Sequence, residues 1–203
     1  MNAADRWEIA LTDGRLSSLL IASGFGPRHV EGAAGVCRWP DPSITRRLLD
    51  AVIACHTIVI CGPTGVGKGQ LACCLARHLI QRTWPWPWKI RRVGMPAWFR
   101  QIKSGAQIAQ YVSPIDLLVI DELHHTDAGA GEQREPGHTH TIWERGRLFE
   151  LIDGRYEARR PTVMTTNMDP DKLNRALDVP VLDRIREAGT VFDLSSWPNR
   201  RGA

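Results

Sequence analysis

The chain has 203 residues, of which 43% are hydrophobic and 24% are charged, and its formal net charge is +4. This composition excludes a disordered or collagen-like chain, and the length suits one domain with a substantial core. The small positive charge permits contact with nucleic acid without requiring it. Five cysteines include no C-x-x-C pair, which predicts free thiols in a reducing compartment. Because we find neither a signal-peptide pattern nor an apolar run long enough for a membrane span, we expect a cytoplasmic protein that does not enter a membrane.

Apolar residues recur with helical spacing in some segments and form short β-branched runs in others. In chain order these patterns predict helices over 14–25 and 41–55, a strand over 57–61, a helix over 68–82, a strand over 88–94, a helix over 97–111, a strand over 116–121, a helix over 142–159, a strand over 161–167, a helix over 180–189 and a strand over 190–194. Residues 126–141 are predicted to form a long polar loop. Strands that alternate with helices predict an α/β fold of three layers, with helices on both faces of a parallel sheet.

The stretch GPTGVGKG follows the predicted strand over 57–61 and opens the next predicted helix. It matches the phosphate-binding pattern G-x-x-x-x-G-K-[ST] except at the last position, where Gly69 stands in place of a hydroxyl residue. Glycines let backbone N–H groups turn toward phosphates, the start of the helix adds positive potential, and Lys68 supplies a charge for the β- and γ-phosphates. The residues predicted to contact the nucleotide are Gly62, Pro63, Thr64, Gly65, Val66, Gly67, Lys68, Gly69 and Gln70.

The hydroxyl that is missing at Gly69 would coordinate Mg²⁺ in a complete phosphate loop. Mg²⁺ commonly keeps several water ligands, so a water can take this position. We therefore expect ATP binding to survive and hydrolysis to be weakened.

Two acidic residues stand at the end of the predicted strand over 116–121: Asp121 is its last residue and Glu122 follows it. This is the edge where open α/β sheets bind ligands. Asp121 is predicted to hold Mg²⁺ through water, and Glu122 to polarise the attacking water. Asn167, at the end of another predicted strand, is the candidate for contacting the γ-phosphate or orienting that water. Taken singly, each motif has an ordinary alternative, a charged turn after a strand or an Asn that forms a turn.

These motifs together resemble the AAA+ ATPases of the bacterial helicase-loader type, DnaC and DnaI, and their relatives, the IstB transposition helper ATPases. The similarity runs from about Arg15 to Arg201 and is most specific over residues 147–167. It implies a P-loop AAA+ sandwich with strand order 5-1-4-3-2 and little or no C-terminal lid. It also implies a short N-terminal segment over 1–40, followed by an ATPase domain over 41–203.

The resemblance further implies a homo-oligomer with ATP at the subunit interface. Arg184 matches the arginine finger that one subunit donates to the ATP of its neighbour; the alternative is a helix-surface arginine paired with Asp183 or Glu187. Arg201, or Arg200 beside it, matches an arginine that senses the nucleotide.

The function implied is that of an ATPase that oligomerises on ATP and loads or remodels a replicative helicase on single-stranded DNA. Two alternatives stay open: an IstB-like helper whose partner is a transposase, and a nucleotide-binding switch in which Gly69 impairs hydrolysis. The segment 84–92, WPWPWKIRR, is either a contact for single-stranded DNA or a proline-stiffened connection. Four histidines of the polar loop region form either a metal site or a solvated surface: His124, His125, His138 and His140.

Overall fold

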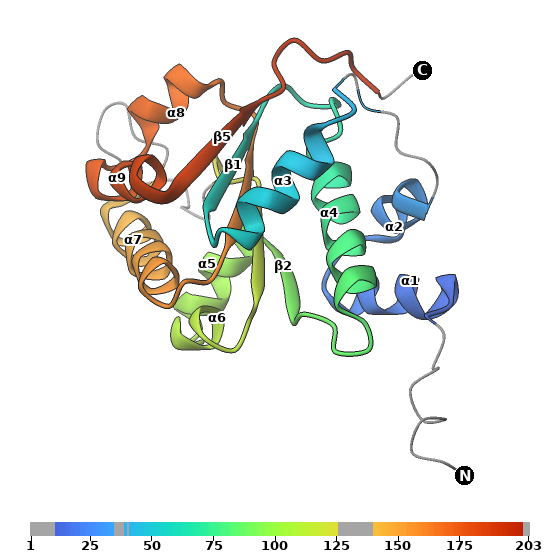
Figure 1. The fold of residues 1–203 in the computed structure, drawn as a ribbon. Coiled ribbons are helices and arrows are strands. Elements are labelled where there is room, and N and C mark those ends of the chain that lie inside the picture. Colours follow the sequence, from blue (N-terminus) through green and yellow to red (C-terminus); the bar gives the residue numbers. More distant parts are fainter. Residues whose placement is uncertain (1–10, 35–38, 40, 126–139, 201–203) are drawn as a thin grey trace.

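Five short segments form one parallel sheet at the centre of the molecule (Figure 1). The computed structural model describes residues 11–34, 39, 41–125 and 140–200. The strands are β1 (Thr57–Cys61), β2 (Ile90–Gly94), β3 (Leu117–Asp121), β4 (Thr162–Thr166) and β5 (Gly189–Asp193). Their order is β2-β3-β4-β1-β5, and every neighbouring pair is parallel. Read from the β5 edge, this is the predicted order 5-1-4-3-2.

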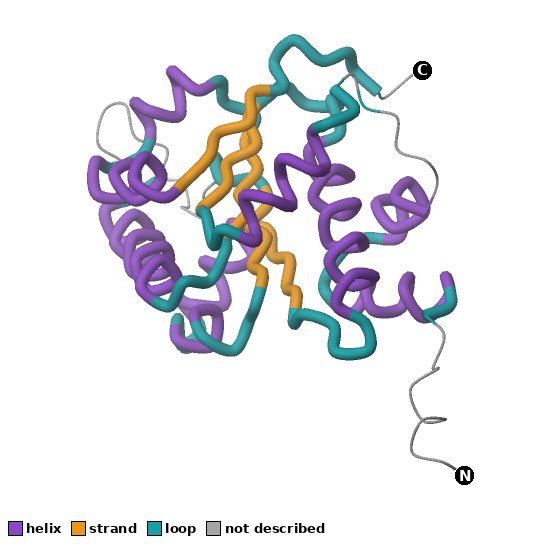
Figure 2. Tube along the Cα trace, viewed as in Figure 1, coloured by secondary structure: helices purple, strands orange, loops and turns teal. Residues whose placement is uncertain are grey.

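Helices cover both faces of the sheet, which confirms the predicted three layers (Figure 2). One layer comprises α1 (Asp13–Ala22), α2 (Pro27–Ala34), α3 (Ile44–Ile53) and α4 (Lys68–Thr83). The other comprises α5 (Met95–Lys103), α6 (Ala109–Val112), α7 (Ile142–Glu157), α8 (Pro170–Ala176) and α9 (Val179–Ala188). Successive side chains of a strand point to opposite faces. Ile58 and Ile60 of β1 therefore pack with the first layer, and Val59 and Cys61 with the second.

Three helical features differ from the prediction. The helix expected over 97–111 is two helices, α5 and α6, because the chain turns at Gly105 with a φ of 101° that side chains disfavour. Helices α2 and α8 were not predicted; each begins at a proline, Pro27 and Pro170. Proline is well suited to the first turn of a helix, since the N–H that it lacks has no partner there.

The turn between α1 and α2 lies directly against β2. The Arg92 N–H donates to the Ser23 carbonyl at 2.6 Å. Gly24 has a φ of 93°, and a Cβ atom at this position would lie 2.5 Å from the Arg92 carbonyl oxygen, so only glycine permits this approach. The contact places α2 beside the start of α4.

A single arginine fastens the second helical layer to the sheet. Arg155 on α7 is 1% exposed, and burial lowers its pKa to about 9. Its guanidinium donates to the Thr162 hydroxyl at 2.8 Å and to the carbonyls of Tyr111, Val112, Ile115 and Pro161 at 2.7, 2.9, 3.1 and 2.6 Å. It thereby joins α7 to the end of α6, the segment before β3 and the start of β4.

The four cysteines in the described part of the chain, Cys55, Cys61, Cys73 and Cys74, are not joined by disulfide bonds, as predicted. Among the helices of the same part, none combines the length and the apolar character that crossing a membrane requires.

Candidate nucleotide site

A cleft of about 760 Å³ opens at the carboxyl edge of the sheet. Segments that are distant in sequence line it: α2, the loop before α4, the ends of β3 and β4, and the chain after β5. The predicted residues that line it are Thr64, Gly65, Gly67, Lys68, Gly69, Gln70, Asp121, Glu122 and Asn167. The fold thus brings the motifs of the phosphate loop, the acidic pair and the strand-end Asn to one place.

The loop over 62–69 passes from β1 into α4 with its glycines in conformations that suit an anion. Gly65 and Gly67 have φ values of 94° and 98°, where a side chain would be strained. Helix α4 begins at Lys68, so the N–H groups of its first turn and its positive dipole end lie at the cleft. Val66, by contrast, is 1% exposed and belongs to the core.

Lys68 spans the loop and β4 in this structure. Its Nζ donates to the carbonyls of Gly62 and Pro63 at 2.7 and 2.9 Å and to Asn167 Oδ1 at 2.7 Å. The side chain of Lys68 therefore lies between two of the predicted motifs. An ammonium held here is placed to meet an anion in the cleft.

Both carboxylate oxygens of Asp121 are engaged by groups of the chain. Arg92 of β2 forms an ion pair with Oδ2, and the Thr165 hydroxyl of β4 donates to Oδ1. Burial alone would raise the pKa of Asp121, but the Arg92 charge and these hydrogen bonds outweigh it and lower the pKa. Asp121 is therefore a carboxylate with its own cation.

Glu122 follows in a strained backbone conformation, with a φ of 61°. Its N–H donates to Thr165 Oγ1 at 3.2 Å, which fixes the turn, and its exposed carboxylate lies 3.6 Å from His125 Nδ1. This geometry directs a solvated carboxylate to the rim of the cleft, where the sequence predicted a base.

His124 connects the acidic turn to Asn167. The Asn167 N–H donates to His124 Nδ1 at 3.3 Å, and the Asn167 amide nitrogen lies 3.1 Å from His124 Nε2. Burial lowers the pKa of His124 to about 4, with the charges of His125 and Lys68 acting in the same direction. The imidazole is therefore neutral near pH 7.

This shift predicts a specific loss of stability in acid. A histidine whose folded pKa lies below its usual 6.5 favours the unfolded state once the unfolded chain takes up the proton. His124 should therefore cost nothing above about pH 6.5 and should destabilise the fold progressively as the pH falls toward 4. Between about pH 7 and about pH 5, the urea midpoint of His124→Gln should fall less than that of the wild type. His78→Gln, on α4, is the control; equal losses in all three proteins would contradict the assignment.

The groups predicted to hold Mg²⁺ do not form an open metal site. Asp121 is paired with Arg92, Gly69 has no hydroxyl, and a Cβ atom at Gly69 would lie 2.9 Å from Nε2 of the His29 ring. Mg²⁺ requires a near-octahedral shell of oxygen atoms, which neither a guanidinium nor an imidazole supplies. Within the described ranges, no group of three or more His, Cys, Asp or Glu residues is placed to share a metal, and His138 lies outside those ranges.

Arg184 lies on α9, on the helical layer that includes α7. Its guanidinium pairs with Asp153 at 2.8 Å and with Glu187 at 3.3 Å, and it stacks on the Tyr156 ring at 4.6 Å. Of the two partners named in the helix-surface alternative, Glu187 is present. The structure thus gives Arg184 a defined position outside the cleft.

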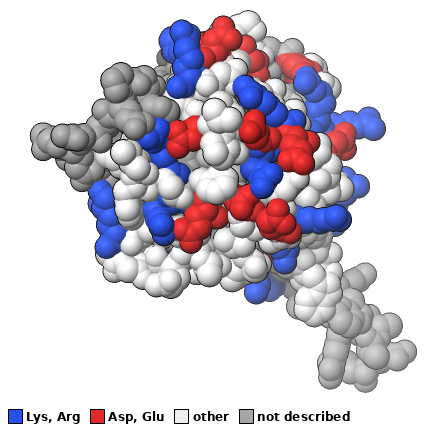
Figure 3. Space-filling view, turned by 90° about the vertical axis from the view of Figure 1, so that its left-hand side faces the viewer, with Lys and Arg blue, Asp and Glu red and all other residues white. Residues whose placement is uncertain are grey.

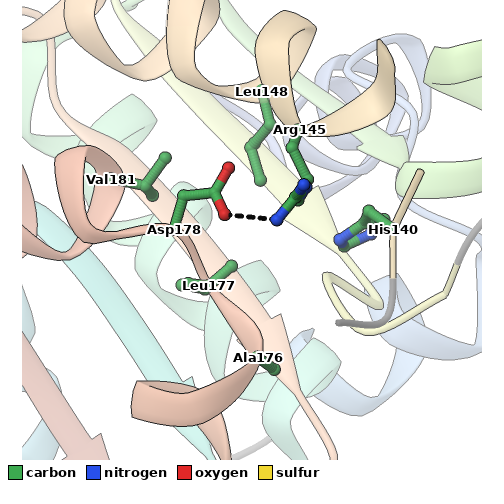
Figure 4. A pocket seen from close by; sticks show the side chains of 7 residues that line it. All are labelled: His140, Arg145, Leu148, Ala176, Leu177, Asp178 and Val181. Atoms are coloured by element: carbon green, nitrogen blue, oxygen red, sulfur yellow. Dashed lines mark hydrogen bonds and ion pairs between the residues drawn. The ribbon is translucent and has the colours of Figure 1, made fainter. Parts of the chain in front are cut away.

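The start of α9 is fixed by a second ion pair (Figure 4). Arg145 of α7 and Asp178, the residue before α9, lie 2.8 Å apart among Leu148, Leu177 and Val181. The hollow between them has essentially no free volume, so it is a packed junction between helices. This junction and the Arg184 pairs hold α9 against α7.

The C-terminal segment returns to the phosphate loop. The Arg200 N–H donates to the Gly65 carbonyl at 2.9 Å, its side chain stacks on Trp39 at 4.4 Å, and the residue lines the cleft. Arg201, which carried the predicted role in nucleotide sensing, lies outside the described residues. Of the two neighbouring arginines, Arg200 is thus the one with an observed place at the site.

Several residues of the cleft were not predicted from the sequence. Arg28 and His29 come from α2, Arg92 from the edge strand β2, and Thr165 from β4. A lone Arg or His carries no motif, and only the packing of α2 and β2 brings these residues to the phosphate loop. Thr165 offered a weak signal, since it lies two residues before Asn167.

The chain has a parallel α/β fold with the glycine-rich loop and the acidic strand end at the carboxyl edge of its sheet, and this fold is similar to that of several solved structures. Solved structures with a similar fold include the DnaC helicase loader, with a TM-score of 0.59 and 20% identity, covering 83% of this chain and 99% of that chain. AMPPCP-bound DnaA from Aquifex aeolicus also gives a TM-score of 0.59, with 15% identity over 87% of this chain and 53% of that chain.

Curated relatives confirm the resemblance drawn from the motifs. The chain is 27% identical over 154 residues to the replicative helicase loader DnaC of Escherichia coli (strain K12), covering 71% of this chain and 56% of that protein. It is also 27% identical over 154 residues to the putative insertion sequence ATP-binding protein y4iQ/y4nD/y4sD of Sinorhizobium fredii (strain NBRC 101917 / NGR234), covering 46% of its length. The chain thus spans about half the length of these relatives. No family profile matches it.

Proposed function

We propose that this chain is the ATPase domain of an assembly factor that binds ATP in the cleft, oligomerises and loads or remodels a replicative helicase on single-stranded DNA. The position of Lys68 carries the proposal, because its ammonium joins the phosphate loop to Asn167 in the cleft that also contains Asp121 and Glu122. The similarity to DnaC supports the choice of partner.

ATP binding follows from the cations and N–H groups of the cleft. An entering triphosphate meets the start of α4 and the Lys68 ammonium, which exchanges carbonyl partners for phosphate oxygens. Glu122 is the proposed base for an attacking water, and Asn167 the proposed residue that orients that water. Since Gly69 lacks the usual hydroxyl, we propose that hydrolysis is slow.

Assembly would complete the site in trans. We propose that Arg184 of one subunit approaches the γ-phosphate bound by the next, where a guanidinium neutralises charge that develops in the transition state. To do so Arg184 must exchange Asp153 and Glu187, its partners within the subunit, for the phosphate. ATP would thereby act as a link between subunits.

Light scattering tests this assembly. With ATP, we expect the wild type to move from monomer to a larger species. Arg184→Ala should bind ATP within about threefold of wild type, because Arg184 lies outside its own cleft, yet lose at least about tenfold in turnover or assembly. Arg186→Ala, on the same helix, is the matched control. A wild type that stays monomeric while it binds ATP would refute the proposal.

Single-stranded DNA is a proposed ligand. The side of the molecule that carries α7 and α9 has no strongly basic surface that would bind it. There, acidic and basic side chains are interspersed (Figure 3). The segment 84–92 remains the candidate contact, and Trp86 is 75% exposed.

A transposase is the second candidate partner, because the relatives include insertion sequence ATP-binding proteins. Pull-down with ATP against a purified replicative helicase and a purified transposase from the same host distinguishes the two. Retention of the helicase alone supports the proposal, and retention of the transposase alone replaces it.

A further inference from the structure

The side chains of His29 and Arg92 lie beside the two positions through which a P-loop ATPase holds its metal. Those positions are the hydroxyl residue after the loop lysine and the acid at the end of the strand. Here the first is Gly69, beside the His29 ring, and the second is Asp121, paired with Arg92. Each of the two positions therefore lies beside a nitrogen-bearing side chain of the chain itself.

The Arg92–Asp121 pair is built into the fold. Arg92 and Asp121 lie on the adjacent strands β2 and β3, and their side chains are only 21% and 14% exposed. Arg92 Nη1 also donates to the Gly24 carbonyl at 3.2 Å, and its backbone N–H donates to Ser23. The planar guanidinium fits a carboxylate better than an ammonium would, and the α1–α2 turn keeps it there.

The His29 ring lies beside the other position, residue 69. Its Nε2 atom lies 2.9 Å from where a Cβ atom at Gly69 would be, so a Ser or Thr at 69 requires the ring to move. Helix α2, which carries His29, is tied to the same turn of α4 by the Gln70 amide, which donates to the Gly32 carbonyl at 2.5 Å. The glycine at 69 thus leaves room for the His29 ring as α2 places it.

We infer that Arg92 is the resident cation of this site, and that the chain binds the phosphates of ATP without a divalent metal ion. The inference rests on the proposed binding of ATP in the cleft. Arg92 neutralises Asp121, which would otherwise repel the phosphates. Arg28, Lys68 and Arg200 line the same cleft and supply further positive charge. A divalent metal ion is then not required for the nucleotide to bind.

Calorimetry with the full chain tests the inference. ATP is titrated once with excess EDTA and once with excess MgCl₂. We expect the two dissociation constants to agree within about threefold. Binding with MgCl₂ but not with EDTA would overturn the inference and leave the proposed function intact. No binding in either buffer would overturn the proposed ATP site, and the inference with it.

Arg92→Gln shows whether Arg92 is the cause. Without its cation, Asp121 repels the phosphates, so affinity in EDTA should fall by about tenfold or more, and MgCl₂ should restore part of it. Arg92→Lys keeps the charge and should retain most of the affinity in EDTA. Equal affinity of Arg92→Gln and wild type in EDTA would refute the role of Arg92.

Arg91→Gln is the matched control. Arg91 is adjacent on β2, but its guanidinium stacks on Tyr111 at 4.8 Å, in the core on the opposite face of the sheet. Its affinity for ATP should match that of the wild type in both buffers. If Arg92→Gln fails to fold, as judged by circular dichroism, the two wild-type titrations and Arg92→Lys still decide the question.

Discussion

Replacing Lys68 with alanine is expected to weaken ATP binding by about 100-fold, which corresponds to about 2.7 kcal/mol. Lys68 Nζ bonds the phosphate loop to the residue that follows β4, through the carbonyls of Gly62 and Pro63 and Oδ1 of Asn167. In the ATP complex the same ammonium would meet the β- and γ-phosphates, and alanine offers neither charge nor donor. Calorimetry with ATP measures the loss.

The control for Lys68→Ala is Lys89→Ala. Lys89 is exposed and immediately precedes β2, at the amino edge of the sheet, far from the cleft. Its replacement should leave affinity unchanged within about twofold. A folded Lys68→Ala protein that binds ATP as well as Lys89→Ala would show that nucleotide binds elsewhere.

Arg155→Met should destabilise the fold by about 3–5 kcal/mol. The guanidinium occupies a site with 1% exposure, where it satisfies four carbonyl oxygens and a hydroxyl at distances of 3.1 Å or less. Methionine fills much of the volume but leaves these buried acceptors without donors. For a chain of this size the loss corresponds to a fall in Tm of about 10 °C. Urea unfolding and thermal melts measure it.

Two further variants show which property of Arg155 matters. Arg155→Lys keeps the charge but cannot supply the planar fork, so it should recover less than about half of the loss. Arg147→Ala removes a half-exposed arginine of the same helix, paired with Glu150 at 2.7 Å, and should cost less than about 1 kcal/mol. Similar stabilities for Arg155→Met and Arg147→Ala would contradict the structural role assigned to the network.

The sheet was predictable because the composition of its central strands is distinctive in the sequence. TIVIC and TVMTT are apolar or β-branched throughout, and LLVID is so up to its final Asp121, as expected of central parallel strands buried on both faces. Their order came from the resemblance, since strand adjacency is not written in local sequence. The missed helix α8 is only seven residues long. Too little periodicity accumulates over that length to predict it.

The site was predictable where its chemistry is carried by contiguous motifs. Lys68, Asp121 and Glu122 lie in such motifs, and the fold brings them to one cleft with Asn167. Arg92 was read only as part of a basic stretch, because nothing in WPWPWKIRR reveals that β2 lies beside Asp121. His29 likewise acquires its place only when α2 packs on α4. The candidate phosphate contacts could be predicted from local motifs. The surroundings of Asp121 could not, because they depend on long-range packing.

The hydrogen bonds between the α1–α2 turn and β2 have a thermodynamic consequence for any protein that binds this turn. The Arg92 backbone N–H holds Ser23, and the Arg92 guanidinium holds both Gly24 and Asp121, so displacement of that turn also disturbs the ion pair at the cleft. Such coupling is reciprocal. If a protein that binds the turn changes the affinity for ATP by some factor, then ATP changes the affinity for that protein by the same factor. Under the proposed function, the α1–α2 turn is therefore a position at which a bound protein and ATP would influence each other's binding.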